Sequence, residues 1–532
     1  MITGSFVGLN LSMRGLYASQ KALNLTAQNI ANSSTEGYTR RVAEFKTFGQ
    51  DRDRIGDPGF GMGGDFISAT RMRDEYLDKK IWNQQSIASE WSIKNEYYTN
   101  LQQIVNEPSV SDLTTNLTDF YSAMDEFAKE PSSTTKRYLV LNRGLQLTTY
   151  FNEVATKLEE FQVELNDSVK MQVDEINSIA DKLRDLNEKI YNTEISGGDA
   201  GFMRDERALL IDQLSEYGNV EVSEMTYGEL INGSEDRRMT ILFGGTVLVD
   251  HKTNRHLEYS KRITAKNEAD VEGLYEVSMQ GGARLDLTSG KLKATLEVRD
   301  GNVANGDSWV KGVPYYMEQL DTIARTFAKA FNEGIKDYNQ DGAIDPDTEK
   351  GNGFADAYTF NSKEGDDVPG IRFFSIDSLS SADFINGKTD LDDINSVYDG
   401  LNAKNISISK DILEDIGNMF KSFTDSGNNN DTEAIQDLMS FTSDKKLFGT
   451  TDVNDFVAGM ITNLGVDAQL AKDLDGSHEA VITQLTNRRE SYSGVSLNEE
   501  ATNLVKFQQM YNASAKVMSV FSEIYNTLVN TI

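Results

Sequence analysis

The sequence predicts a mainly helical α+β protein, with terminal helices paired as a coiled coil, a helical rod-like domain and an inserted β-rich outer domain. Near both ends of the chain, apolar residues recur at alternating spacings of four and three, which is the seam pattern of a coiled coil. From about residue 219 the period becomes that of short strands, and helical spacing returns at about residue 290. Each terminal seam needs a partner helix, so we expect the two ends to meet and to enclose the other domains.

The composition excludes several classes of protein. The 532 residues carry 84 acidic and 52 basic side chains, and the net charge of −32 disfavours binding to nucleic acid or anionic lipid. The chain has no cysteine, which excludes disulfides and thiolate metal sites. No apolar run is long enough to span a membrane, and the first residues lack the features of a cleaved signal. We therefore expect no nucleic-acid partner and no membrane insertion.

The N-terminal seam lies on a helix that we predict over residues 1–32, followed by a Ser-, Thr- and Gly-containing segment that ends it. The Gly-rich residues 39–72 then predict an extended, bent arm. Gln20 lies within the seam, where a polar residue is typical of one that sets register between partner helices. The apolar seam residues that we expect to contact a partner are Leu9, Met13, Leu16, Leu23, Ala27 and Ile30.

The interior divides by period and by composition. Helical spacing over 73–218 is broken at Pro108 and Pro131, and Gly197-Gly198 ends its longest seam. A Gly- and Asp-rich insertion follows the second helical part and is either separate or part of the outer domain. The predicted parts are a coiled-coil helix with its arm (1–72), a helical domain in three parts (73–218, 290–335 and 411–490), a β-rich inserted domain (219–289), the insertion (336–410) and a C-terminal coiled-coil helix (491–532).

The C-terminal helix is apolar on two faces. One row continues the seam to the last residue and includes the polar Gln508 and Ser522, and a second apolar row lies beside it. Two apolar faces on one helix require more than one partner, because apolar surface left in water costs free energy. The residues that we expect to form the assembly seam and a chaperone-binding face are Leu497, Ala501, Leu504, Phe507, Tyr511, Val517, Met518, Phe521, Tyr525 and Leu528.

Few residues suggest chemistry. The chain has three histidines and no nucleophile or phosphate-binding motif, so we predict that it is not an enzyme. Asp337, Asn339 and Asp341 occupy the first, third and fifth positions of a sequence that resembles a calcium loop. The twelfth position is Thr348 rather than glutamate, so the alternative is an acidic, solvated turn. A structural calcium ion at this loop is the one cofactor that the sequence suggests.

Two terminal segments resemble a known family. NIANSSTEGYTR (29–40) is similar to the N-terminal signature of bacterial flagellar axial proteins, the rod, hook and hook-associated subunits. Residues 493–530 resemble the C-terminal signature of the same proteins, and the stretches 202–222 and 289–334 resemble the hook-associated protein 1 family, which builds the hook–filament junction. The residues matching the N-terminal signature are Asn29, Asn32, Gly37, Tyr38 and Arg40.

The resemblance implies a structural role. Subunits of this family form a ring with copies of themselves, between the hook protein and a second junction protein. It also implies export of the unfolded chain through the flagellar type III export apparatus, after a cytoplasmic chaperone has held the C-terminal helix. The implied location is extracellular, at the hook–filament junction of the flagellum, and cytoplasmic before export.

Four alternatives compete with this interpretation. The nearest is another axial protein, such as a hook or distal rod subunit, which would share the terminal signatures but lack the interior stretches. A flagellin fits less well, because residues 29–40 do not follow its N-terminal pattern. From other classes, the acidic loop around Asp337 suggests a secreted calcium-stabilised surface or adhesive protein, and an enzyme within the insertion has no catalytic residues to support it.

Overall fold

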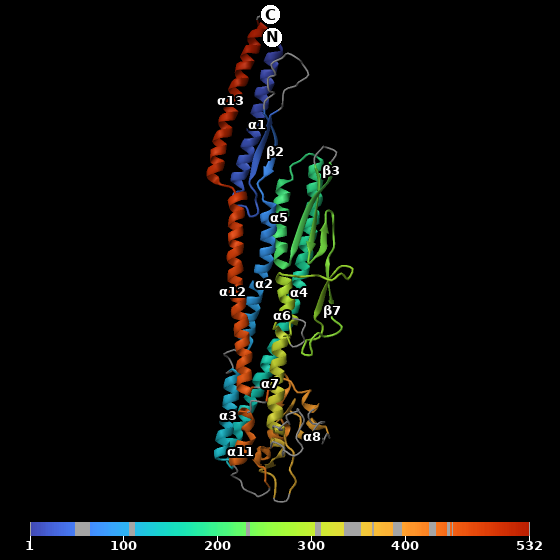
Figure 1. Cartoon of the computed structure of the whole chain (residues 1–532), viewed down its shortest axis with the longest axis vertical. Helices are drawn as coiled ribbons and strands as arrows, with labels where there is room; N and C mark the ends of the chain where they lie inside the picture. The colour runs from blue at the N-terminus through green and yellow to red at the C-terminus, as the bar shows by residue number, and fades with distance from the viewer. Residues whose placement is uncertain are drawn as a thin grey trace.

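The computed structural model shows an elongated molecule in which the N- and C-terminal helices lie side by side at one end (Figure 1). Most of the described residues are helical and several small sheets accompany them, which confirms the predicted mainly α, α+β class. The structure describes residues 2–47, 64–105, 112–229, 235–303, 310–334, 353–363, 366–386, 396–424, 432–443, 447–448 and 451–530.

The two ends of the chain form one structural unit. Helix α1 (Ile2–Ala31) packs along α13 (Leu497–Asn530), and strands β1 (Arg41–Thr47) and β2 (Gly64–Arg71) pack against α1. The arm that we predicted as extended and bent is an antiparallel strand pair, with Arg41 opposite Arg71. We call α1, β1, β2 and α13 the terminal unit.

Long helices build a rod below the terminal unit. The longest, α4, has 62 residues and is about 90 Å long at 1.5 Å per residue. Its apolar positions recur at helical spacing, and Gly197, in a left-handed conformation with φ 77°, follows its end. Figure 1 shows α12 alongside α2. The helices of the rod are α2 (Glu75–Val105), α3 (Leu113–Lys129), α4 (Thr134–Ile195), α5 (Gly201–Tyr217), α6 (Lys291–Asp300), α7 (Val313–Glu333) and α12 (Val453–Ser493).

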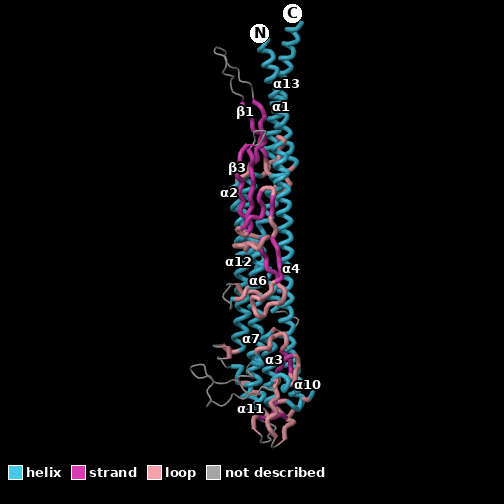
Figure 2. The backbone as a smooth tube through the Cα atoms, turned by 90° about the vertical axis from the view of Figure 1, so that its right-hand side faces the viewer, coloured by secondary structure: helices cyan, strands magenta, loops and turns pink. Residues whose placement is uncertain are grey.

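Strands between residues 220 and 279 form a module on one side of the rod, as Figure 2 shows. The module contains a four-stranded antiparallel sheet of order β3-β4-β5-β6 and a separate antiparallel pair, β7-β8. Its apolar side chains pack against α4 and α5 in a proximal core that includes Val173, Ile241 and Phe243. The strands are β3 (Val220–Glu229), β4 (Glu235–Phe243), β5 (Thr246–Asp250), β6 (Thr253–Asn254), β7 (Leu257–Lys261) and β8 (Tyr275–Met279).

The far end of the rod contains small elements around an aromatic distal core. Phe331 is fully buried there, and the rings of Phe120, Phe327, Phe354, Phe373, Phe374 and Phe441 lie within 5.4–6.5 Å of its own. Strand β10 pairs with β11, and β9 pairs with β12. The small elements are η2 (Phe354–Asp356), β9 (Tyr358–Thr359), β10 (Phe374–Ile376), α8 (Ser381–Ile385), β11 (Ile406–Ile408), α10 (Lys410–Glu414), η3 (Ile416–Asn418), β12 (Phe420–Ser422), α11 (Thr432–Leu438) and η4 (Ser440–Ser443).

These small elements correct two predictions. The described part of the insertion 336–410 does not join the β-rich outer domain, because Phe373, Phe374 and Tyr398 pack into the distal core at the other end of the rod. The third helical part, predicted over 411–490, begins with short elements, and its long helix starts only at Val453. Composition indicated an irregular insertion, whereas the stretch after residue 410 was predicted to be helical and forms mostly short elements up to Val453. Neither composition nor spacing carries information about which distant helix a segment contacts.

A half-buried carboxylate fastens one loop of this distal end. Asp321 on α7 accepts a hydrogen bond from the backbone N–H of Ala403 at 2.8 Å, and Arg325 donates to the Leu401 carbonyl at 3.2 Å. Burial raises the pKa of Asp321 to about 6, despite the hydrogen bond from Ala403 and the charge of Arg325. The folded state binds the Asp321 proton more tightly than the unfolded chain does. The ionised carboxylate therefore lowers the folding stability, with the full cost above the folded-state pKa of about 6 and no cost below the pKa of the unfolded chain.

We therefore expect Asp321→Asn to stabilise the protein by about 2 kcal/mol at pH 8, with the gain shrinking towards zero near pH 4. The amide oxygen still accepts the Ala403 hydrogen bond, but the buried charge is gone. Urea unfolding of both proteins at the two pH values measures the difference. The exposed Asp125 on α3 supplies the control variant Asp125→Asn, which should change stability little at either pH. An equal gain at pH 4 and pH 8 would contradict the pKa argument.

Candidate assembly interface and the joint beneath it

Helices α1 and α13 pack through a row of small residues on α1. A Cβ added at Gly8 would lie 2.4–2.8 Å from ring atoms of Phe521, and one at Gly15 would lie 3.1 Å from the Ser514 hydroxyl. The hydroxyl of Ser12, in the same row, donates to the Gly8 carbonyl at 2.8 Å, so it adds no unsatisfied polar group. The row consists of Gly8, Ser12, Gly15, Ser19 and Ala22, and it lets the two backbones approach closely.

The predicted N-terminal contact row lies a quarter-turn away from this contact. Leu9, Met13, Leu16, Gln20 and Leu23 each follow a member of the small-residue row by one position, which is about 100° around a helix. Met13, Gln20 and Ala27 are exposed, whereas Leu9, Leu16, Leu23 and Ile30 are only half-buried. The two ends meet as predicted, but Met13, Gln20 and Ala27 of this row stay uncovered within the single chain. Apolar spacing shows which side chains need cover, but not which partner provides it.

On α13 the face towards α1 lies between the two predicted rows. Leu504, Phe507, Tyr511, Met518 and Phe521 are half-buried, and the Phe507 ring lies 6.1 Å from that of Phe45. The predicted residues Leu497, Ala501, Val517 and Tyr525 are exposed, as are the polar Gln508 and Ser522, and the side chain of Leu528 lies outside the description. The paired helices thus present uncovered apolar side chains at Leu11, Met13, Tyr17, Leu497, Val505, Met510, Val517, Val520, Ile524, Tyr525 and Val529.

The signature residues form a buried polar lock at the base of the terminal unit. Asn29 donates to Glu500 at 3.1 Å and to the Arg41 carbonyl at 2.9 Å, and it accepts from the Tyr38 hydroxyl at 2.8 Å. Arg40 donates to Glu500 at 2.9 Å, and its backbone N–H bonds to the Ser493 carbonyl. Asn29 and Glu500 are almost fully buried, so each needs these partners.

The remaining two signature residues have local roles. Gly37 adopts a left-handed conformation with φ 75°, which a glycine adopts without strain, and a Cβ added there would lie 3.4 Å from the Leu209 side chain of α5. Asn32 is half-buried and its side-chain amide donates to the Gln28 carbonyl at 2.9 Å, where it closes the end of α1. The five signature residues therefore shape one turn and one lock rather than a catalytic site.

A second buried carboxylate, Asp205 on α5, connects the terminal unit to the rod; we call the region around it and Glu500 the joint. It accepts hydrogen bonds from Arg41 at 3.3 Å and from Arg71 at 2.9 Å, so both strands of the terminal unit meet it. Arg41 also lies over the ring of Phe202 at 4.0 Å. Sequence reasoning missed Asp205, Glu500 and Arg41. Acidic residues such as Glu500 are common in the first turn of a helix for electrostatic reasons alone. Its presence there therefore did not indicate a buried hydrogen-bonding role.

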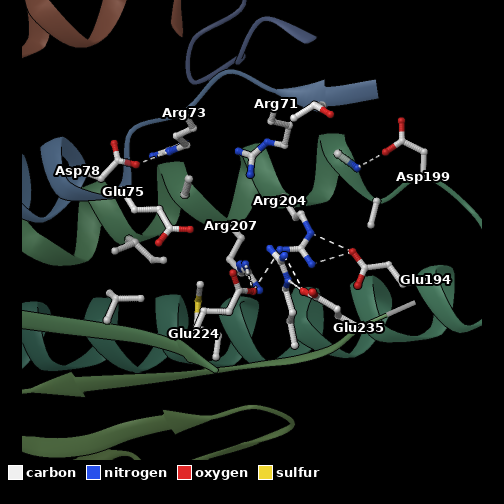
Figure 3. Close-up of a pocket in the computed structure, with 18 of the residues that line it drawn as sticks. Arg71, Arg73, Glu75, Asp78, Glu194, Asp199, Arg204, Arg207, Glu224 and Glu235 are labelled. Carbon is white, nitrogen blue, oxygen red and sulfur yellow. Dashed lines mark hydrogen bonds and ion pairs between the residues drawn. The ribbon is translucent and has the colours of Figure 1, made fainter. Parts of the chain in front are cut away.

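A cleft of about 720 Å³ opens beside the joint. Figure 3 shows its charged side chains, with Arg71 and Arg73 from the end of the arm facing Arg204 and Arg207 of α5. The arginines already have partners: Arg204 pairs with Glu194 at 2.8 Å, and Arg207 pairs with Glu224 at 2.9 Å. Because these charges are satisfied within the chain, the cleft has no surplus charge that would select an anion.

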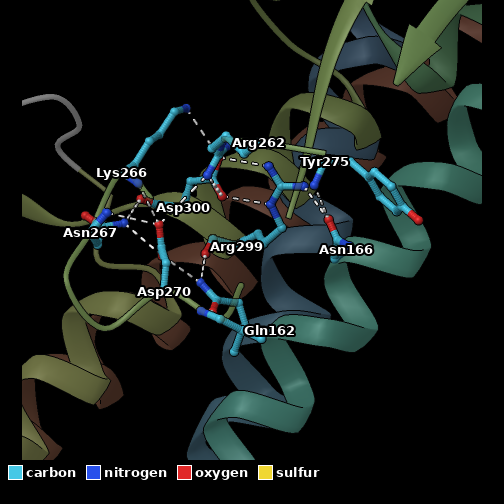
Figure 4. Close-up of polar contacts among 10 residues, drawn as sticks. Gln162, Asn166, Arg262, Lys266, Asn267, Asp270, Tyr275, Arg299 and Asp300 are labelled. Atoms are coloured by element: carbon cyan, nitrogen blue, oxygen red, sulfur yellow. Dashed lines mark hydrogen bonds and ion pairs between the residues drawn. The ribbon is translucent and has the colours of Figure 1, made fainter. Parts of the chain in front are cut away.

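A third polar cluster anchors the β module to the rod (Figure 4). Gln162 and Asn166 of α4 bond to the Arg299 carbonyl and guanidinium, both at 2.9 Å, and Asp300 pairs with Arg299 at 2.7 Å and with Arg262. Burial alone would raise the pKa of Asp300, but the bonds and charges of the two arginines outweigh it and lower the pKa to about 2. Asp300 therefore stays ionised at neutral pH and fixes the module in place.

The described residues offer no metal centre or membrane segment. Among them, no group of three or more potential metal-ligating side chains is found. The predicted calcium ligands Asp337, Asn339 and Asp341 lie outside the described residues. No helix in the described part of the chain combines the length and apolar character that crossing a membrane requires.

Three family models match separate segments of the chain. Residues 98–345 match the model described as flagellar hook-associated protein FlgK helical domain. Residues 9–39 match flagella basal body rod protein, and residues 489–531 match flagellar basal body rod FlgEFG protein C-terminal. The N-terminal match contains Asn29, Asn32, Gly37 and Tyr38 of the signature, and the C-terminal match contains the whole of α13.

Relatives match the chain over its whole length. Flagellar hook-associated protein 1 of Bacillus subtilis is 27% identical over 548 residues, covering 99% of each chain. The protein of the same name from Escherichia coli is 24% identical and covers 98% of this chain and 99% of its own. The solved structure of the flagellar hook junction protein FlgK from Burkholderia pseudomallei has a TM-score of 0.53 and 13% identity. It covers 78% of this chain and 100% of that one, so the likeness concerns the fold.

Proposed function

Because this chain is a flagellar axial protein related to flagellar hook-associated protein 1, we propose that it is a structural subunit of the junction between hook and filament. It acts in the extracellular part of the flagellum after export from the cytoplasm. The full-length match to relatives of that name supports this role. The interior match at 98–345 favours it over a hook or distal rod subunit, for which the two terminal models would suffice.

One structural observation carries the assembly mechanism: the terminal helices meet, yet leave apolar rows uncovered on both α1 and α13. Val517 is 45% and Ile524 is 44% exposed, although both belong to a helix that is already paired. Covering a large apolar side chain contributes about 1.5–3 kcal/mol, so several of them stabilise packing between copies. The assembly seam is therefore the outward face of the terminal unit, and neighbouring copies provide its cover.

The same face supports the choice of partners. We assign copies of this chain as lateral neighbours in a ring, with the hook protein on one side and a second junction protein on the other. Before export, the uncovered row of α13 needs shielding, which fits a cytoplasmic chaperone that delivers the chain to the type III export apparatus. The role requires no catalysis and no cofactor. A calcium ion at Asp337 would act as a structural clamp alone.

Complementation tests the proposal. The chain is expressed in a flagellated bacterium that lacks its own hook-associated protein 1 but keeps the hook and filament proteins. We expect filaments to attach to hooks and motility to return. The matched control expresses the same chain without residues 497–530, which removes α13 and should leave bare hooks. Filament attachment with the truncated chain, or secreted full-length chain that never attaches to hooks, would refute the assignment.

A further inference from the structure

Helix α12 forms one edge of the rod and is covered on one side. In Figure 1 it runs along this edge above α3, with α2 beside it, and α2 is its main neighbour. Val457, Met460 and Leu464 on its inner side belong to the distal core, so the folded rod holds this part of the helix firmly. The outer side of the helix is open to solvent, because its residues are exposed.

The outer side of α12 lacks the charge that covers the rest of the rod. Over 456–471, all of which the structure describes, no exposed residue is charged, and Val466 and Leu470 are 60% and 52% exposed. The stretch 476–484 continues this pattern, with Glu479 as its one exposed charge. On α4, by contrast, most exposed residues between 153 and 189 are charged. We call the exposed side of α12 over 456–484 the outer face.

Two glycines on the outer face are not explained by packing within the chain. A Cβ added at Gly459 or Gly476 would meet no other part of the chain within 4 Å. Glycine inside a helix lowers stability, because the unfolded chain loses more conformational freedom on folding. A partner that packs closely against the helix backbone does need small residues there. The glycines therefore agree with a contact to another molecule, for which the uncharged and apolar surface is the main evidence.

The charge of the chain identifies a second copy as the partner. Each copy has a net charge of −32, so two copies placed side by side repel each other wherever their acidic surfaces meet. A face without charge reduces this repulsion, and the centres of protein interfaces are in general depleted of charged residues. The outer face also runs along the long axis of the molecule (Figure 1), so a copy that covers it lies beside the rod rather than beyond its ends.

We propose that the outer face of α12, centred on Val466 and Leu470, is a lateral contact between neighbouring copies of this chain in the assembled junction. The inference rests on the proposed function and adds a contact at the level of the rod. In a ring the contact is heterologous, so the outer face meets a different surface of the next copy. The folded rod forms this face alone, so the contact requires no particular arrangement of the terminal helices.

Insertion of a charge into the outer face tests the contact in the complemented strain. We expect Val466→Asp and Leu470→Asp each to leave bare hooks, because the contact would bury a carboxylate without a partner. Both side chains are exposed in the single chain, so secretion and the thermal unfolding of the purified variants should not change. The matched control is Met171→Asp on α4, where Met171 is 66% exposed among charged residues, and this variant should still attach filaments.

Photocrosslinking identifies the molecule that covers the outer face. A benzophenone amino acid replaces Gln469, which is exposed beside Leu470, and we expect irradiation of assembled flagella to give a covalent dimer of this chain. A product with a different protein, or no product, overturns the proposal. So does equal loss of filaments with Met171→Asp. Normal filaments with Val466→Asp and Leu470→Asp, in a strain where the unsubstituted chain also attaches filaments, overturn the α12 contact and leave the proposed function standing.

Discussion

Replacing Val517 or Ile524 by aspartate is expected to abolish incorporation into the hook–filament junction while leaving the monomer folded. Both side chains are nearly half exposed in the single chain, where a surface substitution changes stability by less than about 0.5 kcal/mol. In an assembly that covers this row, the same carboxylate would be buried without a partner, which costs several kcal/mol. The measurement is filament attachment in the complemented strain, with circular dichroism and thermal unfolding of each purified variant.

The control is Ser519→Asp. Ser519 is exposed and lies two positions after Val517, about 200° around the helix. The carboxylate that Ser519→Asp introduces should therefore stay in water. Leu504→Asp and Met518→Asp should also block incorporation, but these residues are half-buried against α1, so they weaken the pair within the chain as well. Normal junctions with Val517→Asp and Ile524→Asp would show that this row of α13 is not an assembly surface.

Replacing Phe331 by alanine is expected to destabilise the rod by about 3–5 kcal/mol, the usual cost of removing a large buried aromatic side chain. Phe331 is fully buried, and six aromatic rings surround it, four of them from the chain after α7. The cavity would therefore loosen the far end first. Hydrogen exchange resolved by segment is the suitable measurement, because a molecule with two cores need not unfold in one step.

Tyr76→Ala serves as the comparison, since Tyr76 is an aromatic residue that is 68% exposed on α2. It should cost little, and exchange at the far end should not change. For Phe331→Ala, we expect faster exchange over 366–386 and 396–424, with the proximal core still protected. Uniform acceleration across both cores would mean that the rod is a single cooperative unit, contrary to the two separate clusters of buried residues.

Much of the fold follows from local patterns. The apolar spacing of α4, the glycines after it and the change of period near residue 219 place the long helices and the β module, because each depends on neighbours along the chain. The packing of the far end does not follow, since Phe373 packs against Phe120 of α3, more than two hundred residues earlier in the chain. The packed face of α1 was missed for another reason: Gly8 and Gly15 contribute by being small, which an apolar pattern does not register.

The joint shows a similar limit. Asn29, Tyr38 and Arg40 were found through family resemblance, and their partners were not, because a hydrogen bond between Asn29 and Glu500 joins positions 471 residues apart. The spacing of the outward rows on α13 did indicate a helix with more apolar surface than one partner covers, and the structure shows that surface exposed. Which protein covers it is a question of assembly, and the tests above address it.

Helices from opposite ends of the sequence pack together, and this also sets the order in which the chain can fold. Helix α2 needs α12, and α1 needs α13, so these contacts join segments from opposite ends of the sequence. Contacts of such long separation slow folding, and a chain that leaves a narrow channel from one end cannot make them until its last residues have emerged. The segment from α3 to α7 can form its local contacts early, whereas the terminal unit closes last. The part that joins the subunit to its neighbours thus becomes complete only when the whole chain has arrived.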